Sequence, residues 1–205
     1  DWAQPAGRGA HDQFYNVQVR LYHISNLFGY ANQIRTADPV LAQYYTQRAI
    51  DQYVDFVRDN GGLAYDSYHT GEKALNAGFR GNSYSVNCFS AALNSDEIDT
   101  DAFMSLIKLM WQEPDALCMP SNIWTSHNAA AFQIISVMNY IKYFPEFADA
   151  SVWEESVQNR LSNFATEMTN DDGTYVEATS GYDISVLGTF TNLYKTAKEL
   201  GITIT

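Results

Sequence analysis

The chain has 205 residues, of which 46% are hydrophobic and 18% are charged. This balance excludes an intrinsically disordered chain, which combines low hydrophobicity with high charge. Apolar runs stay well below the roughly 18 residues that a membrane-spanning helix needs, so we expect no integral membrane protein. The formal net charge of −12 makes general binding of nucleic acid improbable, whereas a locally basic cleft on an acidic surface could still accept an acidic sugar polymer.

The first half of the chain predicts three helices from the spacing of its apolar residues. The first covers residues 13 to 33. Asp38 and Pro39 then form a helix start, with the aspartate as N-cap and the proline at the first helical position, and that helix ends at residues 60–62. Asp99 is the predicted N-cap of a third helix.

The second half predicts three more helices, separated by turns. Pro114 and Pro120 indicate a loop, after which a long helix covers residues 126 to 144 and stops at Pro145. Ser151 opens the next helix, which ends at the turn of residues 171–173. A last helix covers residues 184 to 200, with an apolar stripe that includes Leu187, and Gly201 follows as its stop.

Two of these helices differ in how much of their surface is apolar. Residues 132–144 are apolar on nearly every side, which indicates an enclosed helix, whereas residues 151–168 carry a single apolar stripe, which indicates one face in water. Alternating enclosed and half-exposed helices are typical of a double ring of helical hairpins. Residues 61–84 and 171–182 lack helical spacing and predict loops at hairpin ends, where functional residues concentrate.

Three stretches combine polar and aromatic residues in an unusual order. They are Ser121–Asn128, the Phe144-Pro145-Glu146 segment leading into Trp153, and Asp172–Tyr182. Together they resemble the helical-toroid polysaccharide lyases, most closely the heparinase II/III type, and the alginate and chondroitin/hyaluronan lyases with toroid domains share some of these elements. The resemblance covers residues 122 to about 200.

The resemblance implies an all-α fold, an incomplete (α/α) toroid of antiparallel helical hairpins. We therefore expect residues 1–205 to form a single toroid domain, as a fragment of a larger lyase whose β-sandwich part lies outside the sequence. The resemblance also implies a secreted or periplasmic protein that cleaves a uronic-acid-containing polysaccharide by β-elimination.

β-Elimination requires a base for the proton next to the sugar carboxylate, donors that neutralise that carboxylate, and an acid for the departing glycosidic oxygen. The resemblance places the catalytic tyrosine at Tyr182 and the histidine of the helix start at His127. The order here is Ser126-His127-Asn128, whereas the family has asparagine before histidine. Either Asn128 neutralises the carboxylate, or His127 does so and Ser126 replaces the family's asparagine. We expect His127 with Asn128 assisting; the histidine could also act as base while Tyr182 is the acid.

Further residues suit contacts with a sugar chain. Trp124 is either a stacking platform or a core residue, and Glu177 either orients the tyrosine or faces solvent. The Gly-rich stretch 78–87 is a second candidate cleft wall, in which an arginine fork would bind a carboxylate or sulfate and polar side chains would bind hydroxyls. Its candidate residues are Arg80, Asn82, Tyr84 and Asn87.

Two other functions remain open at this point. A toroid glycoside hydrolase would use paired carboxylates, such as Asp172 or Asp183 with Glu177. A non-catalytic glycan-binding helical domain would use Trp124 and Arg80. The sequence predicts no cofactor and no metal site, since it lacks the usual ligand motifs. Cys88 and Cys118 are either a disulfide or two buried thiols.

Overall fold

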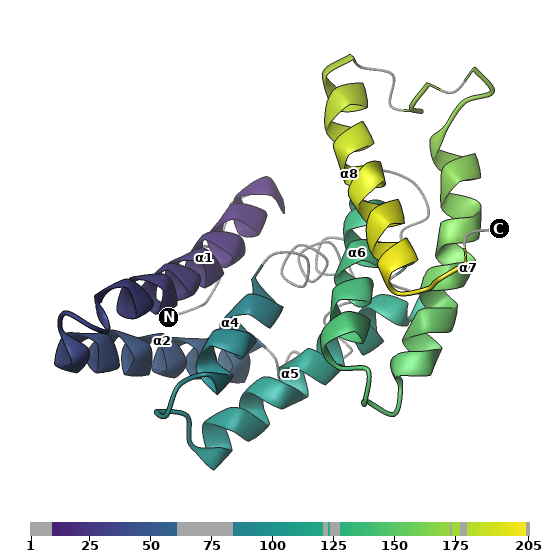
Figure 1. The fold of residues 1–205 in the computed structure, drawn as a ribbon. Coiled ribbons are helices and arrows are strands. Elements are labelled where there is room, and N and C mark those ends of the chain that lie inside the picture. Colours follow the sequence, from purple (N-terminus) through teal and green to yellow (C-terminus); the bar gives the residue numbers. More distant parts are fainter. Residues whose placement is uncertain are drawn as a thin grey trace. The chain divides into compact units, whose positions relative to one another are not determined.

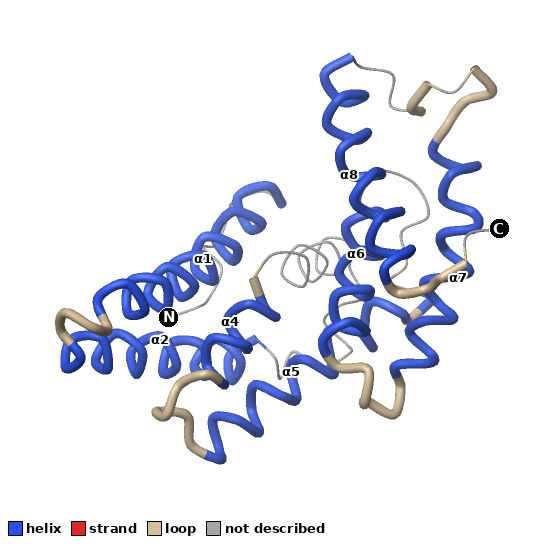
Figure 2. The backbone as a smooth tube through the Cα atoms, viewed as in Figure 1, coloured by secondary structure: helices blue, strands red, loops and turns tan. Residues whose placement is uncertain are grey.

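The computed structural model describes residues 10–60, 84–120, 123, 128–172, 174–176 and 180–203. These residues form helices joined by turns, with one isolated β-bridge between Thr169 and Tyr175 and no strand in the same ranges (Figure 2). The predicted all-α class is therefore confirmed for the described part of the chain, while the toroid arrangement stays a prediction. No described helix is long and apolar enough to cross a membrane.

The helices fall into two compact units. The first unit contains α1 (Ala10–Ile34), α2 (Pro39–Asn60), α4 (Ser85–Leu93) and α5 (Thr100–Cys118) as far as Glu113. The second unit contains the end of α5, from Pro114, together with α6 (Asn128–Tyr143), α7 (Ala150–Met168) and α8 (Ser180–Glu199) (Figure 1).

In the first unit, α1 and α2 form an antiparallel hairpin whose turn is closed by Asp38. Its backbone N–H donates to the carbonyl of Ile34 at 2.8 Å, and its carboxylate accepts from the backbone N–H of Leu41 at 3.0 Å. The predicted N-cap is therefore confirmed. The helices pack along fully buried residues, and α4 covers the same core, where the Tyr53 hydroxyl donates to the carbonyl of Ser85 at 2.9 Å.

Helix α4 corrects the interpretation of residues 78–87 as one loop, because helix begins at Ser85. Val86, Cys88, Phe89 and Ala92 recur at helical spacing and are buried, and this burial outweighs the loop composition of the preceding residues.

Helix α5 also differs from the prediction. Asp99 caps it as expected, accepting from the backbone N–H of Ala102 at 2.7 Å, but the helix continues through Pro114 to Cys118. An internal proline removes one helical hydrogen bond and costs about 3 kcal/mol. The buried stripe that includes Met110 and Leu117 continues across this position and offsets that cost.

In the second unit, α6 packs against both α7 and α8. The predicted contrast between the helices is confirmed. In α6, Ile134, Val137, Met138 and Tyr140 are all buried, and so are the polar residues Gln133 and Ser136. In α7, the predicted stripe is buried along its whole length: Trp153, Val157, Leu161, Phe164 and Met168.

The turn between α6 and α7 is fixed by aromatic rings. Phe144 stacks on Phe147 with ring centres 5.1 Å apart, and Phe147 meets Trp153 edge-on at 6.0 Å. Phe144 of the Phe-Pro-Glu segment therefore helps to hold the turn between α6 and α7.

In α8 the predicted start and apolar stripe are corrected, and the predicted end at Gly201 is confirmed. Helix begins at Ser180, four residues before the predicted start, and Leu187 is 67% exposed although it was assigned to the apolar stripe. Val186, Leu193 and Ala197 form the buried face instead. Gly201 ends the helix with φ +73°, and the backbone N–H of Ile202 donates to the carbonyl of Ala197 at 2.9 Å.

Candidate functional site

Two of the three predicted catalytic residues begin helices of the second unit. Asn128 is the first residue of α6, and Tyr182 lies in the first turn of α8. Residues 180–182 are therefore helical, which corrects their assignment to a loop. The side chains of Asn128 and Tyr182, and the whole of His127, lie outside the described residues.

The direction of α6 and α8 determines where these residues lie along the helix pair. Lys142 Nζ, near the end of α6, lies 3.2 Å from Glu199 Oε2 at the end of α8, and the two helices pack against each other. They therefore run in the same direction, as Figure 1 shows. At a rise of 1.5 Å per residue, Asn128 lies about 21 Å from Lys142 along α6, and Tyr182 lies about 26 Å from Glu199 along α8. Both helix starts thus face the same end of the pair.

The chain before α8 is shaped by a tight turn. Thr169 and Tyr175 form the β-bridge, and the backbone N–H of Asn170 donates to the carbonyl of Thr174 at 2.8 Å. The Tyr175 ring is buried and meets Phe190 of α8 edge-on at 6.0 Å. These contacts anchor residues 174–176 against α8, while Glu177 lies outside the described residues.

Asp172 stabilises the same turn. Its carboxylate accepts from the Thr174 hydroxyl at 2.7 Å and from the Thr174 backbone N–H at 3.0 Å. These two hydrogen bonds hold the pKa of the Asp172 carboxyl below its usual value, so the group is ionised at neutral pH. The role that the geometry gives this carboxylate is therefore structural.

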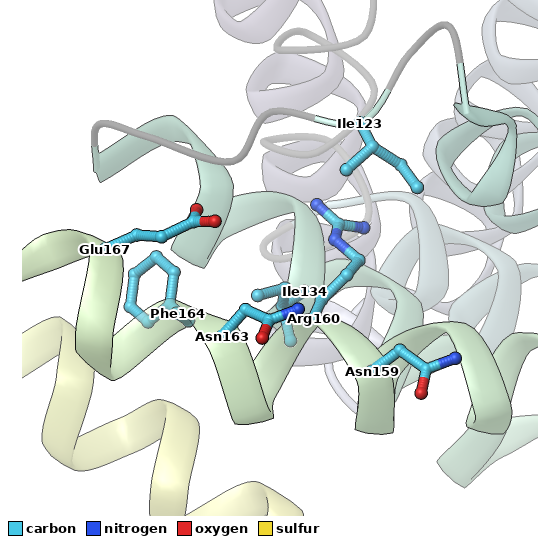
Figure 3. A pocket seen from close by; sticks show the side chains of 7 residues that line it. All are labelled: Ile123, Ile134, Asn159, Arg160, Asn163, Phe164 and Glu167. Carbon is cyan, nitrogen blue, oxygen red and sulfur yellow. The ribbon is translucent and has the colours of Figure 1, made fainter.

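A cavity of about 190 Å³ lies beside α7 (Figure 3). Its wall includes Ile123, which belongs to the predicted Ser121–Asn128 stretch. The remaining lining residues are Ile134, Asn159, Arg160, Asn163, Phe164 and Glu167.

Arg160 is the most constrained charged group of this cavity. One terminal nitrogen donates to Gln133 Oε1 at 2.7 Å, the other donates to the carbonyl of Leu117 at 3.4 Å, and Nε is buried without an acceptor. Burial lowers the pKa of the guanidinium to about 10, against a smaller opposite effect of Cys118. Arg160 therefore joins α7 to α6 and to the end of α5.

The sequence interpretation missed Arg160, although a signal was present. Trp153, Val157, Arg160 and Phe164 recur at intervals of three or four residues, so the arginine falls on the stripe that was predicted to be buried. A charged residue in such a position needs hydrogen-bond partners inside the fold.

Of the residues predicted for the second cleft wall, those at the start of α4 are described by the structure and those before it are not. Tyr84 immediately precedes α4, is half-buried and meets Tyr22 of α1 edge-on, with ring centres 6.4 Å apart. Asn87 lies in α4 and is exposed. Arg80 and Asn82 lie outside the described residues, as does Trp124.

In the described ranges, no group of three or more histidine, cysteine, aspartate or glutamate side chains is arranged to hold a metal ion. Cys88 and Cys118 are free thiols. Burial raises the pKa of Cys88 to about 12 and that of Cys118 to about 11.

Comparison with known proteins gives one family. The family model described as heparinase II/III N-terminus matches residues 32–204, which include most of both units. No curated protein and no solved structure matches the chain.

Proposed function

Because the chain belongs to the heparinase II/III N-terminal family, we propose that it acts as a polysaccharide lyase on a uronic-acid-containing polymer. The family favours a polysaccharide substrate and a lyase reaction. The observation that carries the proposal for this chain is that the matched region contains α6 and α8, whose starts, at Asn128 and Tyr182, face the same end of a parallel pair.

The proposed reaction is a β-elimination. A base removes the proton on the carbon next to the sugar carboxylate, and the electron pair of that C–H bond forms a carbon–carbon double bond. The bond from the neighbouring carbon to the glycosidic oxygen breaks, and this oxygen takes a proton. The products are an unsaturated uronate and a new chain end, and no water is consumed.

The proposed residues meet these needs between them. Tyr182 donates the proton to the leaving oxygen. His127 or Asn128 neutralises the carboxylate, which stabilises the negative charge that develops when the proton leaves. The base is His127 or the tyrosinate form of Tyr182, depending on which face of the sugar carries the proton.

The acidic surface does not oppose such a substrate if cations lie along the binding path. We propose that Arg80 contributes there, because its guanidinium would bind a carboxylate or sulfate through two parallel hydrogen bonds. Asn82, Asn87 and Trp124 are the proposed polar and stacking contacts. Secretion to the cell exterior or periplasm is part of the same proposal, because polymeric substrates of this kind are met there.

The experiment incubates the purified protein separately with alginate, heparan sulfate, chondroitin sulfate and hyaluronan, and follows the ultraviolet absorbance of the unsaturated uronate. We expect a signal with at least one polymer, and a loss of at least about 100-fold in Tyr182→Phe, the size of a typical general-acid contribution. Tyr143→Phe is the matched control, because Tyr143 is an exposed tyrosine at the opposite end of α6. Equal rates in the wild-type protein and Tyr182→Phe would refute the assignment of the tyrosine.

A further inference from the structure

A shallow groove of about 460 Å³ lies between α1 and α2. Helix α1 contributes His23, Asn26, Leu27 and Tyr30, and α2 contributes Tyr45 and Gln52. The four α1 residues lie on a stripe separate from the core face of this helix, because among residues 21–34 the buried ones are Leu21, Ile24, Phe28 and Ala31. The groove therefore lies outside the buried core of the hairpin.

Tyrosine rings form one wall of the groove. Tyr30 is 47% exposed and meets Tyr45 nearly at right angles, with ring centres 5.1 Å apart and an interplanar angle of 80°. Tyr44, which is exposed and does not line the groove, meets Tyr45 in a similar way, at 5.5 Å and 70°. Edge-to-face contacts hold these rings in fixed orientations and leave ring surface in contact with water. A flat apolar surface with a hydroxyl at its edge suits the C–H face of a pyranose.

The aromatic surface continues past the other end of the groove. The rings of Tyr22 and His23 lie 6.1 Å apart, and Tyr22 also contacts Tyr84, which the sequence predicted to bind sugar. Tyr84 and the α1–α2 groove therefore belong to one aromatic surface of the first unit.

Polar groups complete the groove. Asn26 and Gln52 supply amides that both donate and accept hydrogen bonds, as sugar hydroxyls do. Arg48 shares a face of α2 with Tyr45 and Gln52, because these positions recur at three and four residues. Its side chain is exposed and makes no ion pair with the described residues.

The carboxylate closest to Arg48 in the sequence of α2 is that of Asp51. Asp51 accepts a hydrogen bond from Gln47 Nε2 at 2.9 Å, and neither residue lines the groove. Arg48 does not itself line the groove, but it lies on the α2 face of Tyr45 and Gln52 and places a cation there, in a protein whose net charge is −12. A local positive charge of this kind selects an anionic ligand over a neutral one.

We propose that the α1–α2 groove binds an acidic oligosaccharide, with a sugar ring stacked on Tyr30 and Tyr45 and its carboxylate or sulfate on Arg48. The identity of the polymer rests on the proposed lyase function, whereas the groove would bind without any cleavage. It is a binding site separate in residues from the proposed catalytic set of Tyr182, His127 and Asn128, and it would hold a polymer chain during successive reactions.

Binding is measured by isothermal titration calorimetry in the Tyr182→Phe background, which prevents turnover. The probes are uronate oligosaccharides prepared from the polymer that the wild-type protein cleaves, or from alginate and hyaluronan in turn when none is cleaved. We expect Tyr30→Ala to weaken binding about tenfold, the effect of losing roughly 1.4 kcal/mol of contact. Tyr143→Ala is the control, because it removes a ring of similar exposure (51%) from another helix.

The charge is tested in the same assay. Arg48→Ala should weaken binding and reduce its dependence on salt concentration, whereas Arg48→Lys should retain most of the salt dependence. Unchanged affinity in Tyr30→Ala, equal binding of a neutral glucan, or no binding of any of these probes would overturn the proposal. If the groove variants lose binding while no unsaturated uronate forms with any polymer, the lyase function fails and the groove stands.

Discussion

Replacing Arg160 by methionine gives the sharpest test of how the second unit is held together. Methionine has a similar length and fits the apolar wall of Ile134 and Phe164, so the change removes the charged donors with little change in volume. Two effects then oppose each other. The arginine is half-buried, which disfavours folding of the charged form, but its guanidinium donates to Gln133 Oε1 at 2.7 Å and to the carbonyl of Leu117 at 3.4 Å.

The magnitude follows from the shorter bond. A hydrogen bond from a charged donor contributes about 1.5–3 kcal/mol, and the bond of 3.4 Å contributes much less. We therefore expect Arg160→Met to lower the free energy of unfolding by about 2 kcal/mol. For a chain of this size the melting temperature should fall by about 4–8 °C.

The assay is urea unfolding followed by circular dichroism, with thermal unfolding as a second measurement. Arg48→Met is the control, since this exposed arginine should change stability by no more than about 0.5 kcal/mol. The double variant Arg160→Met with Gln133→Leu should recover part of the loss, because it removes the acceptor as well as the donor. An Arg160→Met variant as stable as the wild type would show that the burial cost equals the gain from the bonds, and would refute the reasoning.

Three further predictions concern backbone, pH and thiols. Gly201→Ala should lower the free energy of unfolding by about 1 kcal/mol, because Gly201 has a φ of +73°. Gly188 lies inside α8 with open space around it, so Gly188→Ala should raise the free energy of unfolding by up to about 1 kcal/mol. Equal effects of the two substitutions in thermal unfolding would contradict this prediction. Because the Asp172 pKa is lowered, its stabilisation of the turn is complete above its unfolded pKa and is lost as the pH falls through the folded value. The Thr174 amide shift in an NMR titration should report a midpoint below 3.8, and a midpoint at or above 3.8 would refute it. The raised pKa values of Cys88 and Cys118 predict that iodoacetamide modifies both thiols far more slowly in the folded than in the denatured protein at pH 7. Mass spectrometry measures the two rates, and similar rates in the folded and denatured protein would contradict the prediction.

The helices were predictable because their signals are local. Asp38 and Asp99 bind the backbone N–H groups three residues ahead, and Gly201 adopts the left-handed conformation that ends α8. The stripe of α7 was also correct, since a period of 3.6 residues fixes which side chains share a face.

The errors arose where tertiary packing outweighed a local signal. Pro114 was interpreted as a helix end, but buried neighbours on both sides keep α5 helical. Leu187 was assigned to the core although Val186 occupies that face. The candidate site depends on segments that lack helical periodicity, and periodicity cannot place such segments. The pairing of Arg160 with Gln133 joins residues on different helices, so no local pattern reveals it.

The mass of the reaction products tests the central claim most directly. Mass spectrometry of a uronate oligosaccharide of known length, before and after incubation with the protein, distinguishes elimination from hydrolysis. We predict fragments whose masses sum to that of the substrate, one of them carrying a double bond, and no such fragments with Tyr182→Phe. Fragments whose masses sum to the substrate plus one water would identify a hydrolase and contradict the account, and so would an intact oligosaccharide with every uronate polymer class.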